Sequence, residues 1–126
     1  MRWMVITLYV VVGLINAFPL IGVLGADRLE ALYGVPIVDA DHLLLMRHRA
    51  VLLGLVGGLL LVAAFRPALR PVASVIALVS MLVFLALALP IAEHGAALQR
   101  VFWADAGAVV LLVAAMAISI RGPGPA

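Results

Sequence analysis

Four long apolar runs dominate the pattern of hydrophobic and polar positions along the chain. Leu, Val and Ala supply most of each run, and the runs cover about residues 3–24, 43–65, 72–91 and 99–120. A helix of about 20 residues crosses a bilayer core of about 30 Å. The pattern therefore predicts an all-α protein, an integral membrane four-helix bundle in up-down-up-down order, with residues 1–126 forming a single membrane domain.

Short polar segments separate the runs. Residues 26–33 (ADRLEALY) alternate polar and apolar side chains at a helical spacing, which predicts a short amphipathic helix in the headgroup region between spans 1 and 2. Gly34 and Pro36 are expected to end it. Asp39 then suits the N-cap of the next helix, and Asp41 suits its positively polarised first turn.

The first run has a rival interpretation as a secretory signal peptide, with Arg2 as the charged start. Ile15-Asn16-Ala17 places a bulky residue where a cleavage site needs a small one, so an uncleaved helix is the better prediction. Asn16 and Pro19 lie in the last third of this helix and predict a bend there.

Composition agrees with membrane insertion and excludes several classes of function. The chain is 67% hydrophobic and only 11% charged, whereas soluble domains carry about a quarter charged residues. It has no cysteine, which excludes a disulfide scaffold, a thiol redox enzyme and a thiolate metal site. The net charge of +2 comes from dispersed arginines, which are typical of topology signals and do not predict a nucleic-acid partner.

The charges divide between the two ends of the predicted bundle. One end has arginines without neighbouring acids, and the other has every acidic residue and every histidine; the arginines of the first end are Arg2, Arg66, Arg70 and Arg121. The positive-inside rule then places both termini of this multi-pass protein in the cytoplasm.

Counting helical rise from the arginines locates the polar residues that interrupt the runs. At about 1.5 Å per residue, Arg49 lies about 25 Å, Asp105 about 24 Å and Asn16 about 21 Å from the arginine end. A charge at such depth is costly unless it is paired, so an Arg49–Asp105 pair is predicted. His48 or Arg100 could equally be the partner of Asp105, and the role of Asp105 could be functional or a structural clamp between helices.

These residues suggest a pocket that opens to the outer surface, with an apolar floor and a charged roof. We expect a lipid, a quinone or another lipophilic small molecule to bind there, with the bilayer as the other partner. Arg49 would act as electrophile or anion clamp, Asp105 or Glu93 as base and His48 as proton shuttle. The further ligand-binding candidates are Asn16, Arg47, Trp103 and Arg100.

Alternatives remain open at this point. For Arg47, solvation by lipid headgroups is the competing interpretation. For the whole chain, the competing function is a non-catalytic accessory or assembly subunit of a membrane complex. Too few polar groups lie below the charged level to predict a channel or pump working alone. A small multidrug exporter would need an acidic residue in the first span, which this chain lacks.

The three histidines do not predict a metal or cofactor site. No two of His42, His48 and His94 are spaced three or four residues apart, as a local ligand pair on a helix requires. Small residues recur at helix-packing spacing, as in Gly54 and Gly58 with Gly57 between them. We favour packing within one chain over a homo-oligomer as the explanation.

The segments RLEALYGV, LLLMRHRAVLLGLVGG and VFWADAGAVV resemble small uncharacterised bacterial four-helix membrane proteins near the DoxX-like and related domain-of-unknown-function families. The resemblance spans most of the chain and implies a location in the bacterial inner (cytoplasmic) membrane. Proteins of this group often carry the label phosphopantetheine adenylyltransferase. That enzyme is a soluble α/β protein with a His-x-Gly-His motif, and neither feature is present, so the label is a mislabel.

Overall fold

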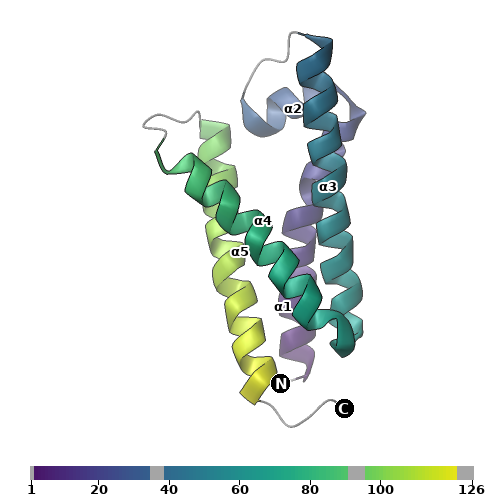
Figure 1. The fold of residues 1–126 in the computed structure, drawn as a ribbon, viewed down its shortest axis with the longest axis vertical. Coiled ribbons are helices and arrows are strands. Elements are labelled where there is room, and N and C mark those ends of the chain that lie inside the picture. Colours follow the sequence, from purple (N-terminus) through teal and green to yellow (C-terminus); the bar gives the residue numbers. More distant parts are fainter. Residues whose placement is uncertain (1, 35–38, 91–95, 122–126) are drawn as a thin grey trace.

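The computed structural model describes residues 2–34, 39–90 and 96–121, and all regular structure in them is helical (Figure 1). Four helical segments are long and apolar enough to cross a membrane, as the four apolar runs predicted. They are Arg2–Ile21, Ala40–Phe65, Pro67–Ala88 and Gln99–Ile120.

The helices follow one another along the chain with short connections. In order they are α1 (Arg2–Ala17), the 3-10 helix η1 (Phe18–Leu24), α2 (Ala26–Tyr33), α3 (Ala40–Phe65), the 3-10 helix η2 (Pro67–Leu69), α4 (Arg70–Ala88) and α5 (Ala96–Arg121).

Proline explains why the first span changes its helix type. Pro19 has no N–H to donate to the carbonyl of Ile15, and its ring crowds that carbonyl. The α-helix therefore ends at Ala17, and the tighter 3-10 turns of η1 continue the span. This change lies where the sequence predicted a bend.

Two of the predicted helix ends are confirmed by their hydrogen bonds. The carboxylate of Asp39 accepts a hydrogen bond of 2.6 Å from the backbone N–H of His42 at the start of α3. At the end of α2, Gly34 adopts a left-handed conformation (φ 67°), and its N–H donates to the carbonyl of Glu30 at 2.7 Å. Pro36, the other predicted end signal, lies outside the described residues. The position of α2 in the headgroup region stays a prediction.

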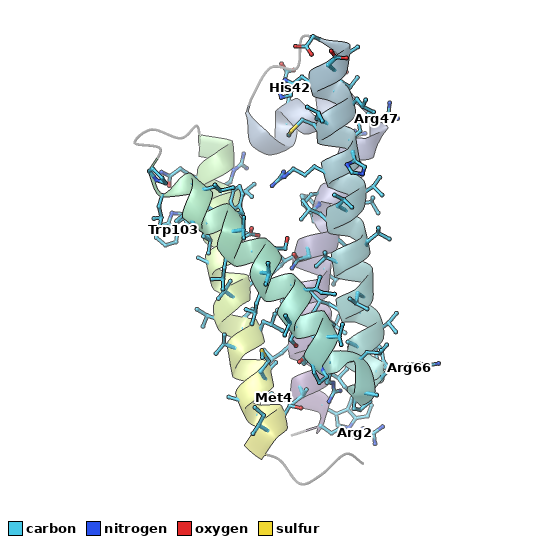
Figure 2. All side chains as sticks on the ribbon, in the orientation of Figure 1. Arg2, Met4, His42, Arg47, Arg66 and Trp103 are labelled. Carbon is cyan, nitrogen blue, oxygen red and sulfur yellow. The ribbon has the colours of Figure 1, made fainter. Side chains whose placement is uncertain are left out.

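The long helices run alternately up and down, so that α1 begins and α5 ends at the same end of the molecule (Figure 1). Helix α1 packs against α3 and α5, and α4 packs against the same two helices. Arg2 and Arg66 lie at one end, which we call the arginine end, while His42 and Arg47 lie towards the other (Figure 2). We call that other end, where Asp39 caps α3, the acidic end.

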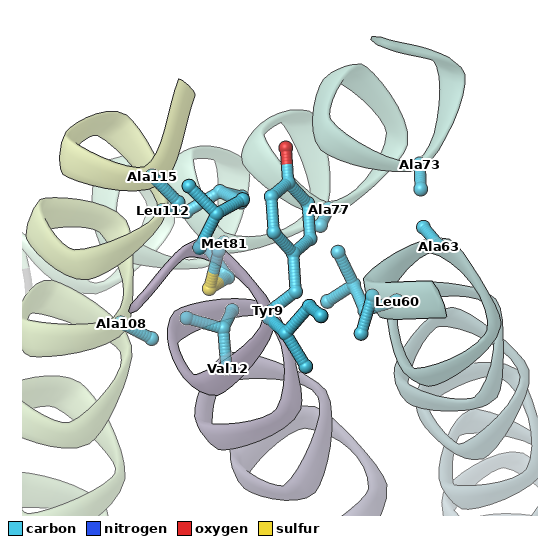
Figure 3. Close-up of a cluster of buried hydrophobic side chains, with 13 residues drawn as sticks. Tyr9, Val12, Leu60, Ala63, Ala73, Ala77, Met81, Ala108, Leu112 and Ala115 are labelled. Carbon is cyan, nitrogen blue, oxygen red and sulfur yellow. The ribbon is translucent and has the colours of Figure 1, made fainter. Parts of the chain in front are cut away.

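The buried core lies towards the arginine end. It combines the first half of α1, the second halves of α3 and α5, and the first half of α4 (Figure 3). Alanines make up much of it, and their small side chains let the helices approach closely. The fully buried members include Tyr9, Leu60, Ala63, Ala77 and Met81.

The acidic end is packed more loosely. From its start beside the end of α3, helix α4 leans away from α3 and towards α5 (Figure 1). Residues 40–49 of α3 and residues 99–107 of α5 include no buried residue. Polar side chains can therefore stand between the separated helices at this end.

Glycine sets the close approach of α1 and α3. A Cβ atom added to Gly57 would lie 2.5 Å from the backbone nitrogen of Ala17 and 2.6 Å from the carbonyl oxygen of Gly13. One added to Gly54 would lie 2.8 Å from the flexible side chain of Leu20, and one on Gly58 would meet nothing within 4 Å. Gly54 and Gly57 thus serve packing within the chain, with Gly57 against backbone, whereas the sequence motif had paired Gly54 with Gly58.

Candidate functional site

Arg49 is the charged residue of α3 that faces the neighbouring helices. Its side chain is half-buried, and its guanidinium carbon lies 5.6 Å from the centroid of the Phe84 ring on α4. A guanidinium at this distance from an aromatic ring is within the range of a cation–π interaction. Arg49 therefore extends from α3 to α4 where the two helices diverge.

Asp105 on α5 completes this group. It is half-buried, and the positive charge of Arg49 acts on its carboxyl group. Among the described residues, α3 and α5 share no extensive contact, so this interaction spans the separation between them. We call Arg49, Phe84 and Asp105 the Arg49 site; it takes one side chain from each of α3, α4 and α5.

Asn16 lies beneath this site in the core. It is only 3% exposed, and its Nδ2 donates hydrogen bonds to the carbonyl of Val12 at 3.0 Å and to the sulfur of Met81 at 3.6 Å. Met81 precedes Phe84 by three residues, which places both on one face of α4. Asn16 thus joins α1 to α4 about one helical turn closer to the arginine end than the ring of Phe84.

Arg47 and His48 lie away from the Arg49 site. Both are exposed and line an open groove together with Ala40, Leu43, Leu44 and Val51. These residues repeat every three or four positions and so share one face of α3. At about 100° per residue, the centre of that face points away from Arg49. The structure therefore places Arg47 and His48 on a different face of α3 from Arg49, whose positive charge acts on Asp105.

The remaining candidates lie on or near α5. Trp103 and Arg100 are both exposed, and the indole N–H of Trp103 donates to Oε1 of Gln99 at 3.3 Å. The Trp103 ring also meets the Phe102 ring edge-on, with centroids 5.4 Å apart, and Trp103 lies on the outer side of the molecule (Figure 2). Glu93 lies outside the described residues. Among those that are described, no three His, Cys, Asp or Glu residues gather as a metal site would require.

A second polar cluster lies at the arginine end, and the sequence interpretation missed it. The hydroxyl groups of Tyr9 and Ser74 share a buried hydrogen bond of 2.7 Å between α1 and α4. The Arg70 guanidinium lies over the Tyr9 ring at 5.4 Å and donates to the carbonyls of Ala63 (3.1 Å) and Ala64 (2.7 Å). Arg70 thus donates to carbonyls of the last turn of α3, of which that of Ala63 also accepts from the backbone N–H of Arg66 at 3.3 Å.

One signal in the sequence could have indicated this role of Arg70. A basic residue just after a helix end can hydrogen-bond the last carbonyls, and Arg70 follows the end of α3 closely. No local signal pairs Tyr9 with Ser74, because the two are far apart in the chain.

Comparison with known proteins adds no further information on function. No protein-family model, no curated protein and no solved structure matches this chain.

Proposed function

We propose that this chain is a multi-pass protein of the bacterial inner membrane that binds a lipophilic small molecule at the Arg49 site. In this proposal the four long helices form an up-down-up-down bundle across the bilayer, with both termini in the cytoplasm and α2 lying among the headgroups. The Arg49 site then lies just beneath the outer surface. The ligand is defined here by its chemistry, as a lipid, a quinone or a similar lipophilic molecule.

The observation that carries this proposal is the half-buried Asp105 of α5, whose carboxyl group lies within the electrostatic influence of Arg49 on α3. Charged side chains within membrane spans are costly, and they commonly mark binding sites or proton pathways. Residues 40–49 of α3 and 99–107 of α5, which include Arg49 and Asp105, contain no buried residue, so the packing around the two charges is open. Separated helices with a charged group between them favour a site that a ligand completes.

The chemistry of the three side chains defines the class of ligand. Arg49 is a donor-only group that suits a carbonyl or an acidic oxygen. Asp105 can accept a proton or a hydrogen bond, and the Phe84 ring offers a flat apolar surface. A lipophilic molecule with a carbonyl or a weakly acidic hydroxyl group, such as a quinone, fits this combination. Arg47 and His48 are left out of the site because they line the groove on another face of α3.

Co-purification tests the ligand. The full chain is purified in a mild detergent, and the small molecules bound to it are identified by mass spectrometry. We expect a lipophilic carbonyl or acidic compound, and we expect Arg49→Gln or Asp105→Asn to lower its occupancy by about tenfold, the effect of losing a hydrogen bond to a charged group. Arg28→Gln, which changes an exposed arginine of α2, serves as the control and should retain it.

The result that would overturn the proposal is equal occupancy in all four folded proteins, or no bound small molecule in any of them. Circular dichroism establishes which variants are folded. An empty wild-type protein would favour the accessory or assembly subunit instead.

The absence of cysteine makes the orientation directly testable. A single cysteine is introduced at Ala68 in η2 or at Ala40 at the start of α3, both of which are exposed. In intact spheroplasts, a membrane-impermeant maleimide should label Ala40→Cys and leave Ala68→Cys unlabelled until the membrane is permeabilised. Labelling of Ala68→Cys in intact cells would contradict the proposed orientation.

A further inference from the structure

The open groove on α3 is lined by both polar and apolar side chains. Its volume is about 370 Å³, it is open on one side, and all of its lining residues come from α3. Arg47 and His48 supply its polar groups, and Leu43, Leu44 and Val51 supply most of its apolar wall. Leu44 is 67% exposed, so this apolar surface is not covered by the described part of the chain.

The height of the groove along α3 matches the boundary between headgroups and acyl chains. Taken from Arg66 at the arginine end, Arg47 lies about 28 Å along the helix axis at 1.5 Å per residue. The hydrocarbon core is about 30 Å thick, so the guanidinium of Arg47 reaches the level of the lipid phosphates. Val51 lies about one turn deeper, at the level of the acyl chains.

The charges at this height favour a phosphate. Arg47 is a permanent cation, and arginine matches the geometry of phosphate oxygens with paired N–H donors. His48, its neighbour, adds a further hydrogen-bond donor. The nearest acid of α3, Asp41, begins the helix about 9 Å further along its axis and is not among the residues that line the groove. Its carboxylate therefore lies beyond the level of the phosphate.

We propose that the α3 groove is a binding site for one phospholipid of the outer leaflet. Arg47 and His48 bind the phosphate, and one acyl chain lies along Val51 and Leu55, the exposed apolar residues of this face that lie deeper than Arg47. This inference rests on the membrane placement of the proposed function, but it does not depend on any ligand at the Arg49 site. It assigns to Arg47 a specific lipid contact in place of general solvation by headgroups.

Lipid retention by the purified full chain tests this site. The protein is exchanged from detergent into solutions that contain either dioleoylphosphatidylglycerol or dioleoylglycerol, which has the same acyl chains but no phosphate. Native mass spectrometry then counts the lipids that each protein retains. We expect about tenfold tighter binding of the phospholipid, and the double variant Arg47→Gln/His48→Gln should remove this preference. When Arg47→Lys replaces Arg47→Gln in this double variant, the positive charge is kept, and much of the preference for the phospholipid should return.

Matched controls separate this site from the Arg49 site. Arg49→Gln should leave phospholipid retention unchanged while it lowers occupancy by the lipophilic ligand, so the two proposals can fail independently. Equal retention of both lipids by the wild type, or unchanged phospholipid preference in the double variant, would overturn the proposal. So would displacement of the lipid by glycerol phosphate at equal concentration, because the groove would then recognise phosphate without the acyl chains.

Discussion

The helices pack differently at the two ends of this molecule. At the arginine end, alanines and Gly57 bring the helices together, and the polar groups there, Tyr9, Ser74 and Arg70, have partners within the chain. At the acidic end α4 leans away from α3, although α3 stays packed against η1, and the positive charge of Arg49 acts on the carboxyl group of Asp105 (Figure 1). The difference places the buried core towards the arginine end, and under the proposed function the acidic end is the one that binds a ligand.

Substitution of Gly57 should produce the largest effect on this comparison. Gly57→Ala places a Cβ atom against the backbone of Ala17 and Gly13, neither of which can move aside by rotating a side chain. We expect a loss of about 3 kcal/mol in the free energy of unfolding, at the upper end of the usual cost of overpacking. Unfolding in mixed micelles measures it.

Gly58→Ala is the matched control, since its added Cβ meets nothing within 4 Å. It should stabilise α3 slightly, by about 0.5–1 kcal/mol, because alanine restricts the unfolded chain more than glycine does. Equal effects of the two substitutions would contradict the close contact of α1 with α3.

The buried hydroxyl pair at the arginine end should give an intermediate effect. Tyr9→Phe removes one partner of the 2.7 Å hydrogen bond and leaves the Ser74 hydroxyl buried without it. The expected cost is about 1.5 kcal/mol, within the range for an unsatisfied buried group. In the double variant Tyr9→Phe/Ser74→Ala both polar groups are gone, so most of the stability should return. A double variant less stable than Tyr9→Phe would show that the pair is not coupled.

The smallest expected effect concerns the Arg49 site. Thermal stability in detergent is measured for Arg49→Ala, Asp105→Ala and the double variant, and the coupling energy should be about 1 kcal/mol. The same cycle with Arg47→Ala in place of Arg49→Ala should show no coupling, because Arg47 lies on another face of α3. Additive losses in the Arg49 cycle would mean that the two side chains do not interact.

Much of the helical framework follows from short-range features of the sequence. Hydropathy over windows of about 20 residues predicts the four spans, and local chemistry predicts the Asp39 cap and the Gly34 helix end. Pro19 indicates an irregularity in the first span, although the change to a 3-10 helix is a finding of the structure. These features depend only on residues that are neighbours in the chain.

The contacts between helices could not be predicted in the same way. Three glycines lie within five positions of α3, and only the rotation of α3 against α1 decides that Gly57 meets backbone while Gly58 faces open space. The partnership of Tyr9 with Ser74 also depends on how distant helices pack. Helical rise predicts that Arg49 and Asp105 lie at the same height. The directions in which the two side chains point depend on how the helices pack, which the sequence does not show.

The length of α3 has a consequence for the membrane around it. Its 26 residues extend about 39 Å, which exceeds a hydrocarbon core of about 30 Å. Under the proposed membrane placement, a bilayer with longer acyl chains would immerse more of the first turns of α3, and a thinner one would bring Arg49 nearer to bulk water. Hydrophobic mismatch would then set how much water reaches Arg49 and Asp105. The acyl composition of the membrane would in this way regulate the Arg49 site without a bound effector.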